Sequence, residues 1–341
     1  MSEALWLSSL HGNQRLLVEE LLSRGFSAKL VDSRLEEIEL TLPDGSSELL
    51  LDRFTSAVPF APLRLSADKH AAKRRMASFG IPVPAGVLCD GLSSPSESAM
   101  AAGLRFPLAA KPNWGSHGDG FRGPLDDSVA LELAADSLVA RGDVPFVVEE
   151  FSPGREFRVF RSISGGFAVL ERIPASAIGD GATSIRGLVE RECIVRASAR
   201  ATGGPVLCPL RADAETELVL ASDGLGLDDV PEAGRVVRLS FASNLARGGT
   251  SRDATDEVCG AWEVFGDLVL SAFPGLPFVG FDVLAESLVR SPEETSFVVL
   301  EANSNPGFSM HAFPASGSSR NVASFAADSL FPSFRRSVVR F

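Results

Sequence analysis

The stretch SFVVLEANSNPGF, residues 296–308, places two oxygen-bearing side chains between an apolar strand and a tight turn. Its apolar run predicts a β-strand that ends at Glu301 and Asn303, and the letters NPG that follow predict a turn. A second apolar run, residues 277–283, predicts another strand with Asp282 near its end. If the two strands are neighbours that end together, these three side chains point at one place.

The chemistry of Asp282, Glu301 and Asn303 suits a hard cation. Mg²⁺ binds one or two carboxylates together with phosphate oxygens, and Mn²⁺ accepts similar ligands. The alternative is that the carboxylates simply end strands at the protein surface, and on the residues alone the two interpretations weigh about the same. The turn after Asn303 favours the metal site, because it fixes the chain directly beyond the ligands.

A lysine followed by glycines, AKPNWGSHGDG at residues 110–120, raises the question of a phosphate site. In a P-loop the lysine ends the glycine-rich turn, whereas Lys111 precedes it and ends a short apolar strand. Its ammonium group and the backbone N–H groups after it could contact a phosphate, since glycine lets a backbone approach closely. Taken alone, such a loop is more often a flexible connection. The candidates for phosphate contact in the loop are Gly115, Ser116, Gly118 and Gly120.

Two further sets of residues offer groups for a nucleotide and for carboxylates. Residues 149–152, EEFS, end a strand, and the backbone of such a connection can bind adenine, while Glu156 can accept hydrogen bonds from ribose hydroxyls. The alternative is a solvated acidic turn, which these residues alone favour. Arginines in one cleft would bind carboxylate or phosphate, although a surface position is about as expected for each. They are Arg158, Arg172 and Arg238.

The composition argues against several classes of function. The chain has 341 residues, of which 45% are hydrophobic, and its net charge of −12 disfavours nucleic acid and anionic membranes as partners. No apolar run approaches the length of a spanning helix and the N-terminus lacks an export signal, so we expect a cytoplasmic protein. Its four cysteines and four histidines share no metal-ligand spacing, and no G-x-S-x-G nucleophile motif occurs.

Helical and strand patterns alternate irregularly along the chain. Hairpins are predicted around residues 43–45 and 164–166. Hairpins mixed with helices favour α+β layers over a regular βαβ winding. Helices are predicted over residues 13–25, 68–79, 126–141, 184–199, 256–273 and 322–330.

In chain order the motifs resemble those of the ATP-grasp ligases. The resemblance covers residues 66–330 and includes AAKPNWGSHGDGF, VVEEFSPGREFRVF, FVGFDV and LEANSNPGFSMHAFP. The segments GDGATSIRGLVE and NLARGGTSRDATDEV are most similar to cyanophycin synthetases and to the ligase domain of bifunctional glutathione synthetases. The resemblance implies an α+β, ATP-grasp fold, in which two α+β subdomains clamp ATP. It implies three units: a reduced N-terminal pre-ATP-grasp unit (1–65), an N-terminal subdomain with the glycine-rich flap (66–150) and a catalytic subdomain with the metal site (151–341).

The resemblance also implies how ATP and metal would be held. Lys69 and Lys111 would contact the phosphates, although Lys73, one helical turn further on, competes with Lys69 for this role. Asp119 departs from the family pattern, since relatives usually carry a basic or neutral residue there, and its charge would repel a phosphate at close range. Adenine would be held by Glu149, Glu150, Phe151 and Ser152, ribose by Glu156, and two Mg²⁺ ions by Asp282, Glu301 and Asn303.

The reaction implied by the resemblance needs no protein nucleophile. A carboxylate of an amino acid or short peptide attacks the γ-phosphate of ATP, and an amine captures the acyl phosphate to form an amide. Arg172 would stabilise the acyl phosphate and its tetrahedral successor. Arg238 and Asn244 would lie in the same cleft, and Arg158 and Arg320 are weaker candidates for holding a substrate carboxylate.

The expected function is therefore an ATP-dependent carboxylate–amine ligase with small-molecule substrates. One alternative is a nucleotide-binding subunit or regulator without turnover, which only Asp119 favours. A carboxylate kinase that releases its acyl phosphate ranks last, because Arg172 and the two most similar segments are retained. Substrate selection is expected between Ala201 and Val237, where the resemblance is weakest. The oligomeric state stays open, a homodimer included.

Overall fold

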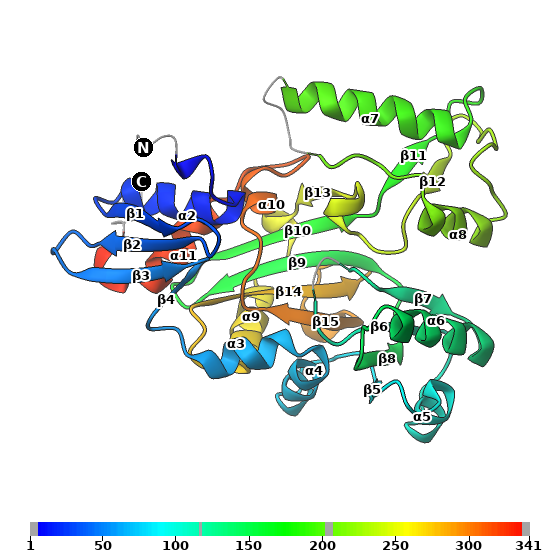
Figure 1. The fold of residues 1–341 in the computed structure, drawn as a ribbon, viewed down its shortest axis with the longest axis horizontal. Coiled ribbons are helices and arrows are strands. Elements are labelled where there is room, and N and C mark those ends of the chain that lie inside the picture. Colours follow the sequence, from blue (N-terminus) through cyan, green and yellow to red (C-terminus); the bar gives the residue numbers. More distant parts are fainter. Residues whose placement is uncertain (1–5, 116–117, 202–206, 336–341) are drawn as a thin grey trace.

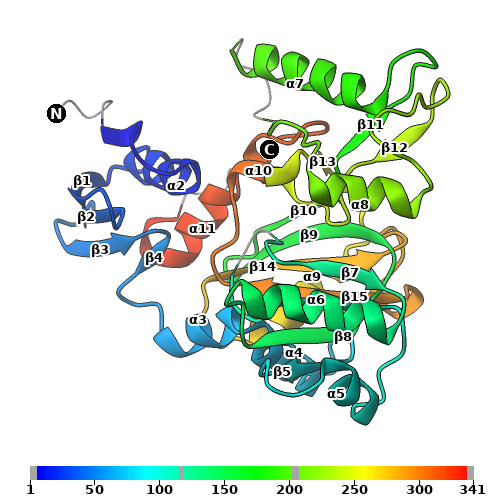
Figure 2. The same ribbon diagram turned by 45° about the vertical axis from the view of Figure 1, so that its right-hand side comes forward.

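The structure is a computed structural model that describes residues 6–115, 118–201 and 207–335, with the side chains of residues 199–201 excepted. Within these ranges the chain forms four β-sheets with helices packed around them (Figures 1 and 2). The paired strands of these sheets are antiparallel. The predicted α+β architecture is confirmed, because a βαβ winding would pair its strands in parallel.

The largest sheet has five strands in the order β13-β10-β9-β14-β15. Helix α9 (Ala261–Ser271) covers one face, where Trp262 and Phe265 share a core with Val159 and Phe281 of the sheet. The strands are β9 (Arg155–Ser162), β10 (Phe167–Ile173), β13 (Thr250–Asp253), β14 (Phe278–Ala285) and β15 (Phe297–Asn303).

The register of this sheet places polar residues in one transverse row. Asp282 of β14 lies opposite Arg158 of β9 on one side and opposite Glu301 of β15 on the other. Arg158 in turn lies opposite Leu170, and Leu170 lies opposite Asp253 of β13. Side chains alternate between the faces of a strand, and the neighbouring residues pack under α9. The row therefore projects from the face away from α9.

Next to this row, the same face of the sheet carries apolar side chains, which pack against the N-terminal part of the chain. Phe160 and Phe278 share a core with α2 (Gly12–Leu22) and α11 (Val322–Leu330). Figures 1 and 2 both show the N-terminal unit against α11. The strands β1 (Ser27–Asp32), β2 (Glu37–Thr41), β3 (Ser47–Leu51) and β4 (Phe54–Thr55) form a four-stranded sheet whose buried side chains enter this core.

A second four-stranded sheet, in the order β5-β8-β6-β7, carries the glycine-rich loop. Its core is formed under α6 (Ser128–Ala140), where Leu131 and Leu138 pack against Ala110 and Val148. Because side chains alternate, Lys111 and Glu149 project from the other face. The strands are β5 (Gly86–Cys89), β6 (Leu108–Pro112), β7 (Arg122–Leu125) and β8 (Phe146–Glu150), with α5 (Pro95–Ala101) beside α6.

A small lobe contains most of the segment in which substrate selection is expected. Its two-stranded sheet pairs β11 (Ser176–Ile178) with β12 (Val236–Arg238). Helices α7 (Ile185–Ala201) and α8 (Ala214–Ser222) complete its core. Two further helices, α3 (Phe60–Ala67) and α4 (Lys69–Ser78), connect the N-terminal sheet to the second sheet.

The predicted elements agree with the structure where the periodic pattern is long. The helix predicted over 322–330 coincides with α11, and the helix predicted over 68–79 is α4. The helix predicted over 256–273 begins later than expected, because residues 255–257 form a separate 3₁₀ turn before α9. Short elements, such as α5 and the strands β11 and β12, had no predicted counterpart, since a few residues carry too little periodicity.

Candidate active site

Asp282, Glu301 and Asn303 come together through strand register. Asp282 lies opposite Glu301, and Asn303 Nδ2 donates to Glu301 Oε1 at 3.1 Å. The expectation that the two strands end together is wrong, because antiparallel neighbours end at opposite edges and Asp282 is the fifth of the eight residues of β14. The register between β14 and β15 shifts by one residue at this point, so Leu300 has no partner on β14. As a result the side chain of Val299 packs in the core, and that of Glu301 faces the site.

Two arginines bind Asp282. Arg158 donates from Nη2 to Oδ2 at 2.9 Å and from Nε to Oδ1, and Arg172 Nη1 lies 3.2 Å from Oδ2. Burial raises the pKa of Asp282, although both guanidinium groups oppose this. Burial also favours a raised pKa for Glu301. Arg158, Lys111 and the hydrogen bond from Asn303 outweigh this effect and lower the pKa of Glu301 to about 2. The site therefore keeps Glu301 ionised at neutral pH.

Glu149 forms a buried cluster with two lysines of the second sheet and α4. Its Oε1 lies 2.7 Å from Lys111 Nζ, and its Oε2 contacts Lys73 Nζ. Burial, and after it the neighbouring Lys111, lowers the pKa of Lys73 well below its usual range. The alternative of a solvated acidic turn is therefore wrong for Glu149, whose side chain is only 3% exposed.

Lys69, and not Lys73, reaches the glycine-rich loop. Its Nζ donates to the carbonyl of Gly115 at 2.7 Å, whereas Lys73 is enclosed beside Glu149. The buried Asn113 joins the two elements, because its carbonyl accepts the N–H of Lys69 at 3.2 Å and its side chain accepts that of the next residue at 3.0 Å. Arg64 of α3 also stacks on Trp114, 4.0 Å from the ring centroid. The base of the loop is thus tied to α3 and α4.

The glycines of the loop are needed for its course. Gly118 and Gly120 have φ angles of 67° and 75°, which other residues adopt only with strain. A Cβ on Gly120 would come within 2.6 Å of Pro112 Cγ, and one on Gly118 would lie 3.7 Å from Asn244 Nδ2. The loop therefore contacts the segment that contains Asn244. Ser116 lies outside the described residues.

Asp119 has a partner of its own. Its Oδ2 accepts a hydrogen bond from Arg141 Nη2 at 2.9 Å, and its side chain is 75% exposed. Arg141 lies directly after α6, so the carboxylate is directed at a surface guanidinium group. Its charge is offset there.

Three of the predicted adenine and ribose residues form hydrogen bonds within the protein here. Glu150 accepts the N–H of Arg105 at 3.0 Å, and the N–H of Phe151 donates to the carbonyl of Pro107 at 2.9 Å. Glu156 accepts from Arg172 Nη1 at 2.6 Å, beside Asp282. A nucleotide base at this connection would therefore use backbone groups other than the N–H of Phe151.

Three predicted residues of the catalytic subdomain also have protein partners. Arg238 donates to the carbonyls of Ser240 and Phe241, and Asn244 Oδ1 accepts the N–H of Ala246 at 2.9 Å. Arg320 donates from Nη2 to Asp253 at 2.7 Å and to Asp256 at 2.6 Å. Arg320 is thus already neutralised by two carboxylates, and a substrate carboxylate would have to displace one of them.

Sequence reasoning missed the residues that hold the loop after β15. Asn13 Oδ1 accepts the N–H groups of Phe308 and Ser309, each at 2.8 Å. Arg53 donates to the carbonyl of Asn305 at 3.2 Å, and its guanidinium group lies 5.4 Å from the ring centroid of Phe308. Nothing in the local pattern of Asn13 indicates this, because its partners lie almost 300 residues away in the chain.

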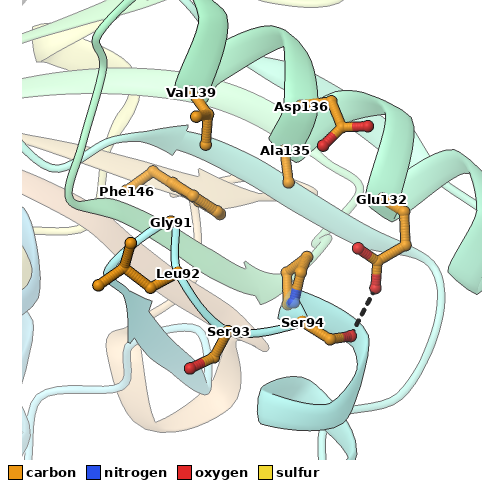
Figure 3. Close-up of a pocket in the computed structure, with 10 residues that line it drawn as sticks. Gly91, Leu92, Ser93, Ser94, Glu132, Ala135, Asp136, Val139 and Phe146 are labelled. Carbon is orange, nitrogen blue, oxygen red and sulfur yellow. Dashed lines mark hydrogen bonds between the residues drawn. The ribbon is translucent and has the colours of Figure 1, made fainter.

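A separate pocket of about 230 Å³ lies between α6 and the loop before α5 (Figure 3). Phe146 and Val139 line it, together with Glu132, which accepts a hydrogen bond from Ser94 Oγ at 2.7 Å. None of the predicted site residues that the structure describes lines this pocket. The candidate active site is therefore the polar row of the large sheet with the lysines beside it.

The oxygen-bearing side chains Asp282, Glu301 and Asn303 fit a metal ion that is bound together with the phosphates of a nucleotide. Within the described ranges, no group of three or more His, Cys, Asp and Glu side chains could hold a metal by itself. Asp282 and Glu301 supply two carboxylates and Asn303 an amide on one face. Mg²⁺ needs few protein carboxylates when phosphate oxygens and water complete its shell.

Comparison with known proteins finds relatives over most of the chain. No protein-family model matches it. It is 34% identical to the cyanophycin synthetase of Trichormus variabilis over 273 residues, which are 79% of this chain and 30% of that protein. It is 28% identical over 331 residues to the glutathione biosynthesis bifunctional protein GshAB of Pasteurella multocida, covering 93% of this chain and 42% of that protein.

A solved structure supports the same relationship. The crystal structure of a bifunctional glutathione synthetase from Pasteurella multocida matches with a TM-score of 0.64 at 26% identity, covering 94% of this chain and 44% of that chain. The chain spans less than half the length of these relatives. No helix among the described residues is both long enough and apolar enough to cross a membrane. The chain is therefore a homologue of the cyanophycin and bifunctional glutathione synthetases and has the ATP-grasp fold.

Proposed function

We propose that the chain is an ATP-dependent ligase that joins a carboxylate to an amine. The carboxylate belongs to an amino acid or short peptide, and the products are an amide, ADP and phosphate. The proposal is supported by the names of the relatives, which are synthetases of cyanophycin and of glutathione. It includes a cytoplasmic location and the three units 1–65, 66–150 and 151–341.

The observation that carries the proposal is the interaction of two charged clusters from two different sheets. Burial lowers the pKa of Lys111, and Glu301 is the strongest opposing influence. Burial likewise lowers the pKa of Lys69, again opposed by Glu301. Lys111 of the second sheet and Lys69 of α4 are therefore close enough to Glu301 of the large sheet for their charges to act on each other. A polyphosphate between them would meet ammonium groups on one side and metal ligands on the other.

In this proposal each candidate residue has a role toward ATP. Asp282, Glu301 and Asn303 would hold Mg²⁺, which supplies positive charge that neutralises the phosphates. Lys69 and Lys111 bind phosphate oxygens, as do the backbone groups of the glycine-rich loop. The connection over residues 149–152 holds the adenine, and Glu156 the ribose.

The reaction proceeds in two displacements. An oxygen of the substrate carboxylate attacks the γ-phosphorus, and the bond from phosphorus to the leaving ADP oxygen breaks. The amine nitrogen then attacks the acyl carbon, phosphate leaves and the nitrogen loses a proton. In this proposal Arg172 stabilises these steps, and a supporting observation is that its Nε is buried without a hydrogen-bond partner among the described residues. The loss of such a donor costs about 3–4 kcal/mol in the transition state.

ADP release tests the proposal directly. The purified chain is incubated with ATP and Mg²⁺ against panels of amino acids and short peptides, singly and in pairs. We expect ADP release that needs both an acid and an amine, and a loss of at least about 100-fold in the Glu301→Ala variant. The control is Glu293→Ala, because Glu293 lies in a short 3₁₀ turn outside the candidate site and its loss should leave turnover unchanged.

The alternative of a nucleotide-binding protein without turnover is less favoured than the ligase. Asp119 was its only basis, and the pairing with Arg141 offsets that charge. Binding of ATP without acceptor-dependent ADP release under any of these conditions would nevertheless refute the ligase and favour the binding protein.

A further inference from the structure

The imidazole of His311 is enclosed in the protein without a hydrogen-bond partner. The residue is 0% exposed, and neither Nδ1 nor Nε2 has a partner within the described part of the chain. A buried polar group without a partner costs stability, and an apolar side chain of similar size would avoid that cost. We therefore infer that the histidine at this position has a functional role, which offsets its cost in stability.

His311 lies at the boundary between the apolar core and the polar row of the large sheet. Its ring meets Phe160 edge-on, with the centroids 6.2 Å apart. Phe160 is two residues beyond Arg158 on β9 and projects from the same face. The charges of Arg158 and Asp253, both in the polar row, act on the imidazole. The ring therefore packs on the strand that carries Arg158, close enough for the charges of Arg158 and Asp253 to act on it.

The short helix α10 (Ser309–Ala312) that carries His311 is held at both ends. Asn13 accepts the N–H groups of Phe308 and Ser309 at its start. At its end the N–H of Arg320 donates to the carbonyl of His311 at 2.8 Å. These contacts fix the backbone of His311, so the position of its ring over the sheet is determined by the fold.

The imidazole is neutral and offers one donor and one acceptor. Burial, with the positive charge of Arg158 as a second cause, lowers the pKa of His311 to about 3. A neutral imidazole has one N–H and one free nitrogen lone pair. Beside Arg158, the ligand group that gains most from an N–H donor is an anion, and the proposed reaction brings a carboxylate to this face.

We propose that His311 is a specificity-determining residue that donates a hydrogen bond to the carboxylic acid substrate. The proposal rests on the proposed function, because it assigns the acid to the face that bears Arg158 and Arg172. The imidazole gains its missing partner when the acid occupies the site. Discrimination then follows, since an acid that cannot accept this hydrogen bond leaves the buried N–H unpaired.

Two apolar variants separate a substrate contact from a structural role. In His311→Leu and His311→Phe we expect a Tm equal to that of the wild type or higher, because an unpaired polar group is removed. We expect the KM for the acid to rise about 10-fold or more, while the KM for ATP changes less than about 2-fold. The probe is the acid with the highest ADP release in the amino-acid panel.

A conservative variant and a binding measurement complete the test. His311→Gln keeps a donor and should recover part of the affinity for the acid. Unchanged kinetic constants in both apolar variants, or a rise confined to the KM for the amine, would overturn the proposal. If the wild type releases no ADP, the proposed function fails on its own. In that case, calorimetric titration with the twenty amino acids tests the proposed role of His311. Equal affinities in the wild type and the variants would refute that role.

Discussion

At the scale of single residues, Glu149 shows how strongly the site depends on paired charges. It is buried between Lys73 and Lys111, and each lysine would lose its ion-pair partner without it. Its neighbour Glu150 carries the same side chain on a partly exposed position and pairs with Arg105 at the surface. The letters EE do not distinguish the two, but burial does.

Glu149→Ala should therefore destabilise the protein by about 3–5 kcal/mol, because the removal of one partner leaves buried charge unpaired. Glu150→Ala is the matched control and should cost less than about 1 kcal/mol, as expected of a surface pair. Urea unfolding followed by fluorescence or circular dichroism measures both free energies. Equal losses in the two variants would contradict the burial of Glu149 between the lysines.

Asp119 shows the opposite limit of residue-level reasoning. The sequence places its charge among glycines that are expected near phosphate, and the structure pairs it with Arg141. The partner lies 22 residues away, beyond a helix. No local pattern identifies it, because ion pairs between separate elements depend on how those elements pack.

At the scale of elements, the loop after β15 determines whether the site is well ordered. It follows Glu301 and Asn303 directly and leads into α10 with His311. The N–H groups of Phe308 and Ser309, where it meets α10, donate to Asn13 of α2, which belongs to the N-terminal unit. The N-terminal unit therefore supports the candidate active site as well as the hydrophobic core.

Asn13→Leu should lower kcat about 10-fold or more and raise the KM for the acid, since two N–H groups of the loop lose their acceptor. Asn13→Asp keeps a side-chain oxygen and should retain most of the activity. Steady-state kinetics with Tm as a second measurement distinguish this positioning role from general instability. A Tm loss in Asn13→Leu with unchanged kinetic constants would show that Asn13 only stabilises the fold.

At the scale of the whole molecule, ATP should act as a bridge between two sheets. The lysines lie on β6 and α4 beside the second sheet, and the metal ligands lie on β14 and β15 of the large sheet. A ligand that contacts both sides binds the folded protein only, so its binding free energy adds to the stability.

ATP with Mg²⁺ should raise the Tm, by the equivalent of about 2.7 kcal/mol at a concentration 100 times the Kd. The metal-dependent part of this rise should disappear with EDTA and in Glu301→Ala. Thermal unfolding with and without each component measures these shifts. If ATP raised the Tm by the same amount in EDTA, the proposal that the carboxylates bind a metal ion would be contradicted.

The sequence by itself determined the long elements of the fold and the polar residues that are proposed for the site. Long periodic runs predicted helices such as α4 and α11, because side-chain spacing reports directly on which face is buried. The strand over residues 296–303 and its oxygen-bearing side chains were also evident from the residues alone. These features are local, and a local pattern contains the information that specifies them.

Only the tertiary structure decided which groups meet. The alignment of Asp282 with Glu301 follows from an antiparallel register with a bulge, and the sequence had suggested strand ends instead. The choice of Lys69 over Lys73 for the loop, the support from Asn13 and the unpaired ring of His311 likewise depend on contacts between distant segments. The physical reason is that pairing and burial are set when all elements pack together, and no single segment of the chain specifies them.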